Sequence, residues 1–179
     1  MKAEEPRKRS FAPVVDAGTR LLVLGSLPGE RSLAAARYYA HPQNQFWRLI
    51  GGVIGQDIAA LPYEDRLTAL LGAGIGLWDV VASATRTGSL DTAIRDHQAN
   101  DLATLIASLP ALQALAFNGA TSARIGRKAI GDTPLALIDL PSSSPAYTLP
   151  FAEKQVRWRQ LAAFITPCRH CERSEAIQG

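Results

Sequence analysis

Leu21-Leu22-Val23-Leu24-Gly25-Ser26-Leu27-Pro28-Gly29 is the stretch that decides the fold of this 179-residue chain. Its first four residues are apolar, which is typical of a buried strand. The two glycines and the proline predict a tight turn at the carboxyl end of that strand. In open α/β sheets, ligands bind in the crevice beyond the carboxyl ends of the strands. We therefore expect the loop at 25–29 to border a binding site.

Apolar runs alternate with helical patterns along the rest of the chain. Strands are expected at 20–25, 75–81, 112–117 and 135–138. Helices are expected at 30–37, 44–54, 62–71, 92–108, 121–130 and 151–165, with a break near Asn100-Asp101. Such alternation favours a parallel sheet between two helix layers. The sequence thus predicts an α/β fold, a three-layer α/β/α sandwich with a central, mostly parallel four-stranded sheet.

The composition is that of a globular protein, with 47% hydrophobic and 20% charged residues. A formal charge of +3 is small for a protein that coats long stretches of duplex. It fits a small footprint on DNA, and it also fits an ordinary metabolic enzyme. Because no apolar run approaches the roughly 18 residues of a membrane helix and no signal peptide is visible, we expect a cytoplasmic protein without membrane contact.

The chain is expected to form one domain over residues 11–165. Residues 1–10, which include Arg7-Lys8-Arg9, are expected to form a flexible basic arm, and residues 166–179 a disordered tail. The tail holds Cys168 and Cys171, which could bind a metal ion, but a second pair of ligands is missing. We therefore predict no metal site.

Two further polar clusters accompany the 25–29 loop. One is rich in aromatic residues, from Tyr38 to Trp47, and the other follows the last expected strand at 141–146. The chain has no P-loop, no dinucleotide fingerprint and no Gly-x-Ser-x-Gly elbow. A hydrolase of small molecules that uses Ser26 stays a weak alternative. Backbone amides, uncharged polar groups and aromatic faces suit a planar base and a phosphate better than a covalent intermediate.

Together, three motifs resemble those of the uracil-DNA glycosylase superfamily. They are Gly25-Ser26-Leu27-Pro28-Gly29, His41-Pro42-Gln43-Asn44-Gln45-Phe46-Trp47 and Leu140-Pro141-Ser142-Ser143-Ser144. The branch that the chain resembles most is that of the hypoxanthine (deoxyinosine) DNA glycosylases, related to the mismatch-specific uracil/thymine glycosylases.

The resemblance implies a DNA glycosylase that hydrolyses the N-glycosidic bond of a flipped deaminated base, above all hypoxanthine, in base excision repair. Uracil or G:U/T mismatches are alternative substrates, and a non-catalytic DNA-binding module on the same fold is a second alternative. The expected partner is DNA with a damaged or mismatched base, bound by a monomer without cofactor. Since the motifs contain no lysine that could form a Schiff base, no lyase activity is expected.

The catalytic residue implied by the resemblance is Asn44. Mismatch-specific relatives position the attacking water with an asparagine in the first motif, where this chain has Leu27, and the hypoxanthine branch places the working asparagine in the second cluster. An amide oxygen can accept a hydrogen bond from that water. Asn44 also stands just before an apolar helical pattern, where it could simply cap the helix. Both roles stay open.

The resemblance also assigns a base pocket and a DNA-contacting loop. Phe46 would stack on the base, and Asp79 could accept the N1–H of hypoxanthine or merely cap a loop. The other pocket residues would be Gly25, Ser26, Leu27, Pro28 and Gly29. The loop that contacts DNA phosphates would contain Pro141, Ser142, Ser143 and Ser144. Asn118 is interpreted as turn chemistry.

Overall fold

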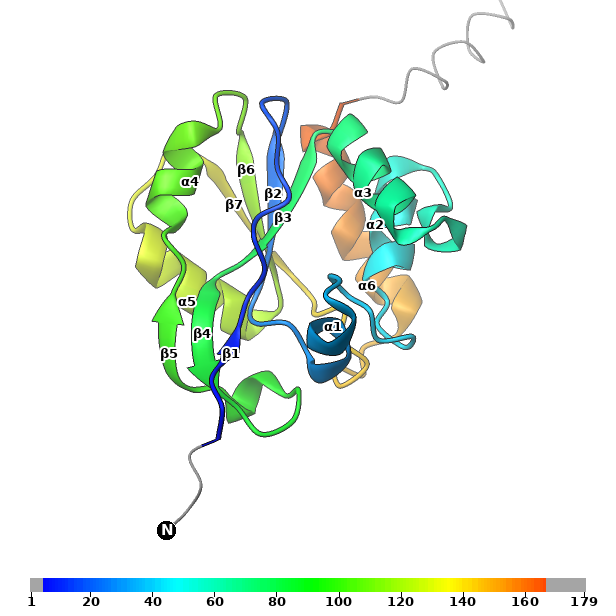
Figure 1. The fold of residues 1–179 in the computed structure, drawn as a ribbon. Coiled ribbons are helices and arrows are strands. Elements are labelled where there is room, and N and C mark those ends of the chain that lie inside the picture. The colour runs from blue at the N-terminus through cyan, green and yellow to red at the C-terminus, as the bar shows by residue number, and fades with distance from the viewer. Residues whose placement is uncertain (1–4, 167–179) are drawn as a thin grey trace, which may run out of the picture.

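A parallel sheet with the strand order β3-β2-β6-β7 forms the centre of the computed structural model, which describes residues 5–166 (Figure 1). The strands are β2 (Leu21–Gly25), β3 (Ile75–Asp79), β6 (Ala114–Asn118) and β7 (Ala136–Leu140). All three pairings in this sheet are parallel. The two inner strands, β2 and β6, are buried along their whole length, which explains their continuous apolar sequences.

Helices cover both faces of the sheet (Figure 1). One face carries α2 (Phe46–Ile54), α3 (Tyr63–Gly72) and α6 (Phe151–Trp158), and the other carries α4 (Leu102–Ser108) and α5 (Ala120–Ile130). Side chains of the sheet point alternately into two apolar cores, with Leu21 and Val23 in one and Leu22 and Leu24 in the other. The predicted three-layer sandwich is confirmed. No helix within 5–166 combines the length and the apolar character needed to cross a membrane.

A small antiparallel sheet lies beside the main one, in the order β1-β4-β5. Its strands are β1 (Lys8–Arg9), β4 (Val81–Thr85) and β5 (Arg95–Ala99). The helix expected at 92–108 is therefore wrong over its first half, where a short 3₁₀ turn (Asp91–Ala93) leads into β5. Every residue of β5 is exposed, so this edge strand has none of the alternation that identifies a strand in a sequence.

The second half of that expected helix forms as α4, which begins after the predicted break and has Asp101 as its N-cap. The Asp101 carboxylate accepts a hydrogen bond from the backbone N–H of Thr104 at 3.1 Å. The arm at 1–10 differs from the expectation, since Lys8 and Arg9 pair with β4 and Arg7 forms an ion pair with Asp96 at 2.8 Å. The tail with Cys168 and Cys171 lies outside the described residues.

The remaining short elements surround the carboxyl edge of the sheet and its helical cover. They are α1 (Glu30–Ala35) and the 3₁₀ segments Ile58–Ala60 and Arg159–Phe164. Gly25 at the end of β2 lies opposite Asp79 at the end of β3, and Asn118 and Leu140 end the next two strands. From β2 the chain runs to β3 on one side, and β6 lies on the other side of β2. Such a change of direction opens a crevice at the carboxyl edge.

Candidate active site

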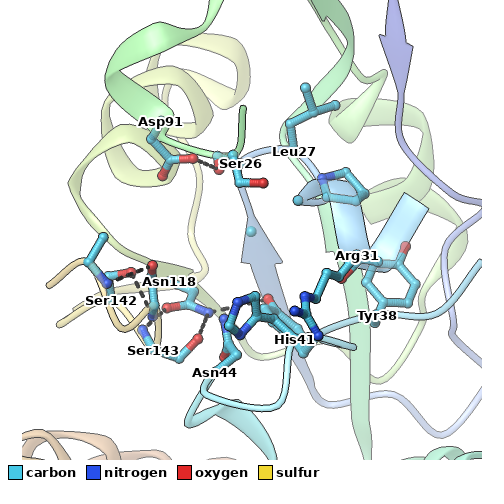
Figure 2. Close-up of a pocket in the computed structure, with 18 of the residues that line it drawn as sticks. Ser26, Leu27, Arg31, Tyr38, His41, Asn44, Asp91, Asn118, Ser142 and Ser143 are labelled. Carbon is cyan, nitrogen blue, oxygen red and sulfur yellow. Dashed lines mark hydrogen bonds between the residues drawn. The ribbon is translucent and has the colours of Figure 1, made fainter. Parts of the chain in front are cut away.

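A cavity of about 260 Å³ lies beyond the carboxyl ends of the four parallel strands (Figure 2). It is lined by the 25–29 loop after β2, Asp79 of β3, Asn118 of β6 and residues 142–146 after β7, while Asn44 comes from the segment before α2. The structure thus brings together all three clusters that the sequence singled out. The volume is near the lower end of small-ligand pockets, about 300–1,000 Å³, and suits a ligand as small as a nucleobase.

Asn44 lines this cavity and lies one residue before Gln45, the N-cap of α2. Its Oδ1 accepts a hydrogen bond from the backbone N–H of Phe46 at 3.0 Å. The next residue, Gln45, donates its N–H to the carbonyl oxygen of Ser143 at 3.0 Å, which ties this segment to the 141–146 loop. Because an amide oxygen has two lone pairs, the hydrogen bond from Phe46 leaves one that can accept from a ligand or a water molecule.

Asp79 is the most perturbed acid in the cavity wall. It is only 3% exposed, and its Oδ2 has no hydrogen-bond partner within residues 5–166. Burial, reinforced by the negative charge of Asp91, raises the pKa of Asp79 to about 7, while Arg86 acts in the opposite direction. A buried acceptor without a partner is costly unless a ligand supplies the donor. Asp79 can therefore bind a donor group of a ligand.

Gly25 is required by the close approach of two side chains. A Cβ at this position would lie 2.6 Å from Oδ1 of Asp79 and 3.1 Å from the hydroxyl oxygen of Tyr39. Glycine alone lets the carboxyl group and the phenol meet over the end of β2.

Tyr39, rather than Phe46, presents an aromatic ring to the cavity. Phe46 is fully buried, packs edge-on against Trp47 and Trp158, and does not line the cavity, so the predicted base contact through Phe46 is wrong in this structure. Tyr39 lines the cavity and stacks on Phe46 with ring centroids 3.9 Å apart. Phe46 is the first residue of α2 and faces the core, so its ring packs against the side of the Tyr39 ring that faces the core.

The backbone of Tyr39 adopts a conformation unusual for its residue type. Its φ is 53°, in the left-handed region, which costs a non-glycine residue roughly 1–2 kcal/mol. Its hydroxyl accepts a hydrogen bond from Nδ2 of Asn118 at 3.3 Å. Burial and nearby Asp79 raise the pKa of Tyr39, so the phenol stays neutral. The strained residue is thus held at the cavity by a polar contact as well as by the stack.

A buried arginine stabilises the 25–29 loop through hydrogen bonds to its backbone. Arg86, only 2% exposed, donates to the backbone carbonyls of Leu27 at 3.3 Å, of Gly88 at 3.0 Å and of Pro28. The hydroxyl of Ser26 donates to Oδ1 of Asp91 at 2.5 Å (Figure 2). Burial raises the pKa of Asp91, against the lowering effects of Ser26 and Arg86. Among the hydrogen bonds of residues 5–166, none joins Ser26 to a histidine, as a serine hydrolase would require.

The 141–146 loop is held by four residues from three parts of the chain, β6, α6 and the segment before α2. Asn118 exchanges two hydrogen bonds of 2.9 Å with Ser143, one from Nδ2 to Oγ and one from the Ser143 N–H to Oδ1 (Figure 2). From α6, Lys154 donates to the Ser144 carbonyl at 3.2 Å, and Trp158 donates to the Pro141 carbonyl at 3.0 Å. The fourth contact is that from Gln45. The loop is therefore a fixed wall of the cavity.

The residues predicted to contact DNA fall into two groups. Pro141 is buried and does not line the cavity, and Ser143 lines it but is 1% exposed and hydrogen-bonded to Asn118, so DNA contact by these two stays a prediction. Ser142 and Ser144 are half-buried and line the cavity beside the exposed Pro145 and Ala146. Leu27 also lines the cavity, but its side chain packs in the core under α4 and α5.

Four residues of the site were missed from the sequence. Tyr39 and Asn118 could have been found, because the first belongs to the aromatic cluster and the second ends a parallel strand. Arg86 and Asp91 carried no signal, since their roles depend on the β4–β5 hairpin. Within 5–166, no three His, Cys, Asp or Glu side chains are grouped so that they could hold a metal ion.

Comparison with known proteins gives a consistent result at three levels. Residues 12–164 match the family described as the uracil DNA glycosylase superfamily. A hypoxanthine DNA glycosylase of Methanosarcina barkeri is 45% identical over 116 residues, which are 65% of this chain and 73% of that protein. One of Methanosarcina acetivorans is 43% identical over 112 residues, 63% of this chain and 71% of that protein.

The fold has a solved counterpart. It is the solution NMR structure of a candidate uracil DNA glycosylase from Methanosarcina acetivorans, with a TM-score of 0.78 and 35% identity. The match covers 88% of this chain and 97% of the other. The parallel sheet, the cavity at its carboxyl edge and these matches lead to one conclusion: the chain belongs to the uracil DNA glycosylase superfamily.

Proposed function

We propose that this protein is a DNA glycosylase that removes hypoxanthine from DNA. The observation that carries the proposal is the cavity itself, where Asn44 and Asp79, whose Oδ2 has no hydrogen-bond partner within residues 5–166, line one space of nucleobase size. Relatives that are 43–45% identical bear the name hypoxanthine DNA glycosylase, which supports the choice of base.

The base would enter the cavity after flipping out of the helix, which costs a few kcal/mol. The ring of Tyr39 offers a stacking surface, worth about 1–3 kcal/mol per base in comparable contacts. In its ionised form, Asp79 would accept the N1–H of hypoxanthine. Adenine carries a lone pair at N1 and would be repelled by the same carboxylate.

Asn44 would orient the attacking water at the anomeric carbon. N-glycosidic cleavage is largely dissociative, so the water needs orientation more than deprotonation. The oxygen of Asn44 keeps a lone pair for this purpose beside its hydrogen bond from Phe46. Fixed dipoles around the cavity, including the backbone amides of the 25–29 loop, would stabilise the developing charge.

The proposal includes hydrolysis without strand cleavage. A lyase step needs an amine that can attack the sugar, and no lysine lines the cavity in the described part of the chain. Lys154, the lysine beside the 141–146 loop, donates to the Ser144 carbonyl and stands outside the lining. Borohydride should therefore trap no covalent adduct with DNA, and a trapped adduct would contradict this part of the proposal.

A panel of duplexes tests the choice of substrate. Single-turnover base release would be measured with the enzyme in excess on duplexes that contain hypoxanthine, uracil, xanthine or a G:T mismatch. We expect release to be fastest from hypoxanthine. Faster release from the uracil or G:T duplex would contradict the choice of hypoxanthine and would make the faster substrate the preferred one. Binding to abasic DNA without release of any base would point to a non-catalytic module.

A further inference from the structure

A second cavity of about 490 Å³ lies next to the first and shares four wall residues with it. The shared residues are Tyr38, Tyr39, His41 and Asn44. The other walls come from the end of α1, from α2, and from the segment that runs from residue 59 into α3. The two cavities therefore lie side by side, with Asn44 in the wall of both.

Three arginines line this second cavity, which we call the arginine groove. They are Arg37, Arg48 and Arg66, and no carboxylate is among the lining residues. Within residues 5–166, the ion pairs involve Arg7, Lys8 and Arg127 and none of these three. Their positive charge is therefore not neutralised inside the protein.

Aromatic rings hold the three guanidinium groups in place. Arg37 lies 5.3 Å from the ring centroid of Tyr63, Arg66 lies 5.3 Å from that of Trp47, and Arg48 lies 4.1 Å from that of Phe151. Arg66 also donates to the carbonyls of Leu61 and Ala59. Arg37 and Arg48 make no such hydrogen bond in the described part of the chain. A guanidinium that rests on a ring keeps its N–H donors for a ligand with planar oxygen pairs, such as phosphate.

We propose that the arginine groove binds the phosphodiester backbone of the strand that carries the damaged base, next to the flipped nucleotide. This inference rests on the proposed function, because it starts from a sugar placed at Asn44. With the sugar there, the adjoining backbone has to leave the first cavity, and the groove lies next to that point because Asn44 and His41 line both cavities. The three arginines of the groove also bring positive charge together in one place, although the net charge of the whole chain is only +3.

Binding and its salt dependence test the groove directly. The variants are the double variant Arg37→Gln and Arg48→Gln, and separately Ala35→Glu, which adds a negative charge at an exposed position of the groove wall. Lys128→Gln is the control, since it removes a charge from the last turn of α5, far from the carboxyl edge of the sheet. Fluorescence anisotropy would give Kd on hypoxanthine-containing and undamaged duplexes over a range of salt concentrations.

Both groove variants should raise Kd severalfold on either duplex, while Lys128→Gln should not. The slope of log K against log salt should become shallower by about 0.9 for each phosphate that the variant no longer neutralises. Single-turnover release at saturating enzyme should stay within about twofold of the parent rate. An unchanged Kd and an unchanged salt slope in both groove variants would contradict the proposal that the arginine groove binds the phosphodiester backbone. The binding measurements do not depend on turnover. A parent protein that releases no base would therefore contradict the proposed function, while the binding measurements would still test the arginine groove.

Discussion

At the scale of single residues, the proposed chemistry of the site uses one carboxyl group and one amide. Asp79 stands at the end of a buried strand with an unpartnered oxygen, and its pKa of about 7 lets it exist in both protonation states near neutrality. Asn44 is a neutral group, so its role does not change with pH. Base selection and water orientation are therefore separable by mutation.

Replacing Asp79 with asparagine should weaken the discrimination between bases. The Asn amide can donate to N1 of adenine, whereas Asp79 in its ionised form, which dominates above its pKa of about 7, can only accept. A good polar base contact is worth about 1–3 kcal/mol of discrimination, so the ratio of hypoxanthine to adenine release in Asp79→Asn should fall about tenfold or more. Single-turnover rates on matched duplexes give this ratio. An unchanged ratio would mean that Asp79 does not read the base.

The same residue should make stability depend on pH. The ordinary pKa of 3.8 is raised to about 7 in the folded protein, so the folded state binds more protons than the unfolded state between these values. The free energy of unfolding should thus fall as pH rises from about 4 to about 7. Asp79→Asn should flatten this dependence in urea unfolding. Equal slopes in parent and variant would contradict a raised pKa at Asp79.

Gly25→Ala should displace the groups that meet over β2. The new Cβ would lie 2.6 Å from the Asp79 carboxyl oxygen, and real contacts are essentially never that short. We expect base release to fall at least about tenfold, since a misplacement of about 1 Å can already slow catalysis by more than that. Gly72→Ala is the matched control, because its Cβ would contact nothing within 4 Å. Full activity of Gly25→Ala would show that the close approach is not needed.

At the scale of elements, the β4–β5 hairpin holds the 25–29 loop in place. Arg86 extends from just after β4 and donates to the carbonyls of Leu27 and Pro28, and Asp91 engages Ser26 from the turn before β5. The hairpin is also the part of the fold that the sequence predicted least well. Its exposed strand lacks periodicity, and Arg86 lies between the strand expected at 75–81 and the helix expected at 92–108.

Arg86→Lys should separate the charge of this residue from its geometry. Lysine keeps the positive charge near Asp91 but cannot reach three carbonyls at once. We expect a loss of about 1–3 kcal/mol in the free energy of unfolding and slower base release at saturating enzyme. Arg20→Lys is the control, since Arg20 also donates to a backbone carbonyl, that of Ile165, but at the amino end of β2, away from the 25–29 loop. Slower release in the control and not in Arg86→Lys would contradict the role of the hairpin.

At the scale of the whole molecule, the strand order decides where the site lies. β3-β2-β6-β7 places Asp79, Gly25, Asn118 and the 141–146 loop in one row along a single edge. This much was predictable, because buried parallel strands have continuous apolar sequences and carry their ligands at their carboxyl ends. It was not predictable that Tyr39 lines the cavity in place of Phe46. The two rings stack, and only three-dimensional packing decides which one covers the other.

The most direct test is single-turnover release of hypoxanthine by Asn44→Ala, compared with Asp101→Ala. Both variants lose a side-chain hydrogen bond to a backbone N–H in the first turn of a helix, worth about 0.5–1.5 kcal/mol, one at α2 and the other at α4 on the opposite face of the sheet. Both should therefore melt a few degrees lower, by a similar amount. Asn44→Ala should release the base at least about a hundredfold more slowly than the parent, and Asp101→Ala should match the parent. Release by Asn44→Ala at the parent rate would contradict the catalytic role of Asn44.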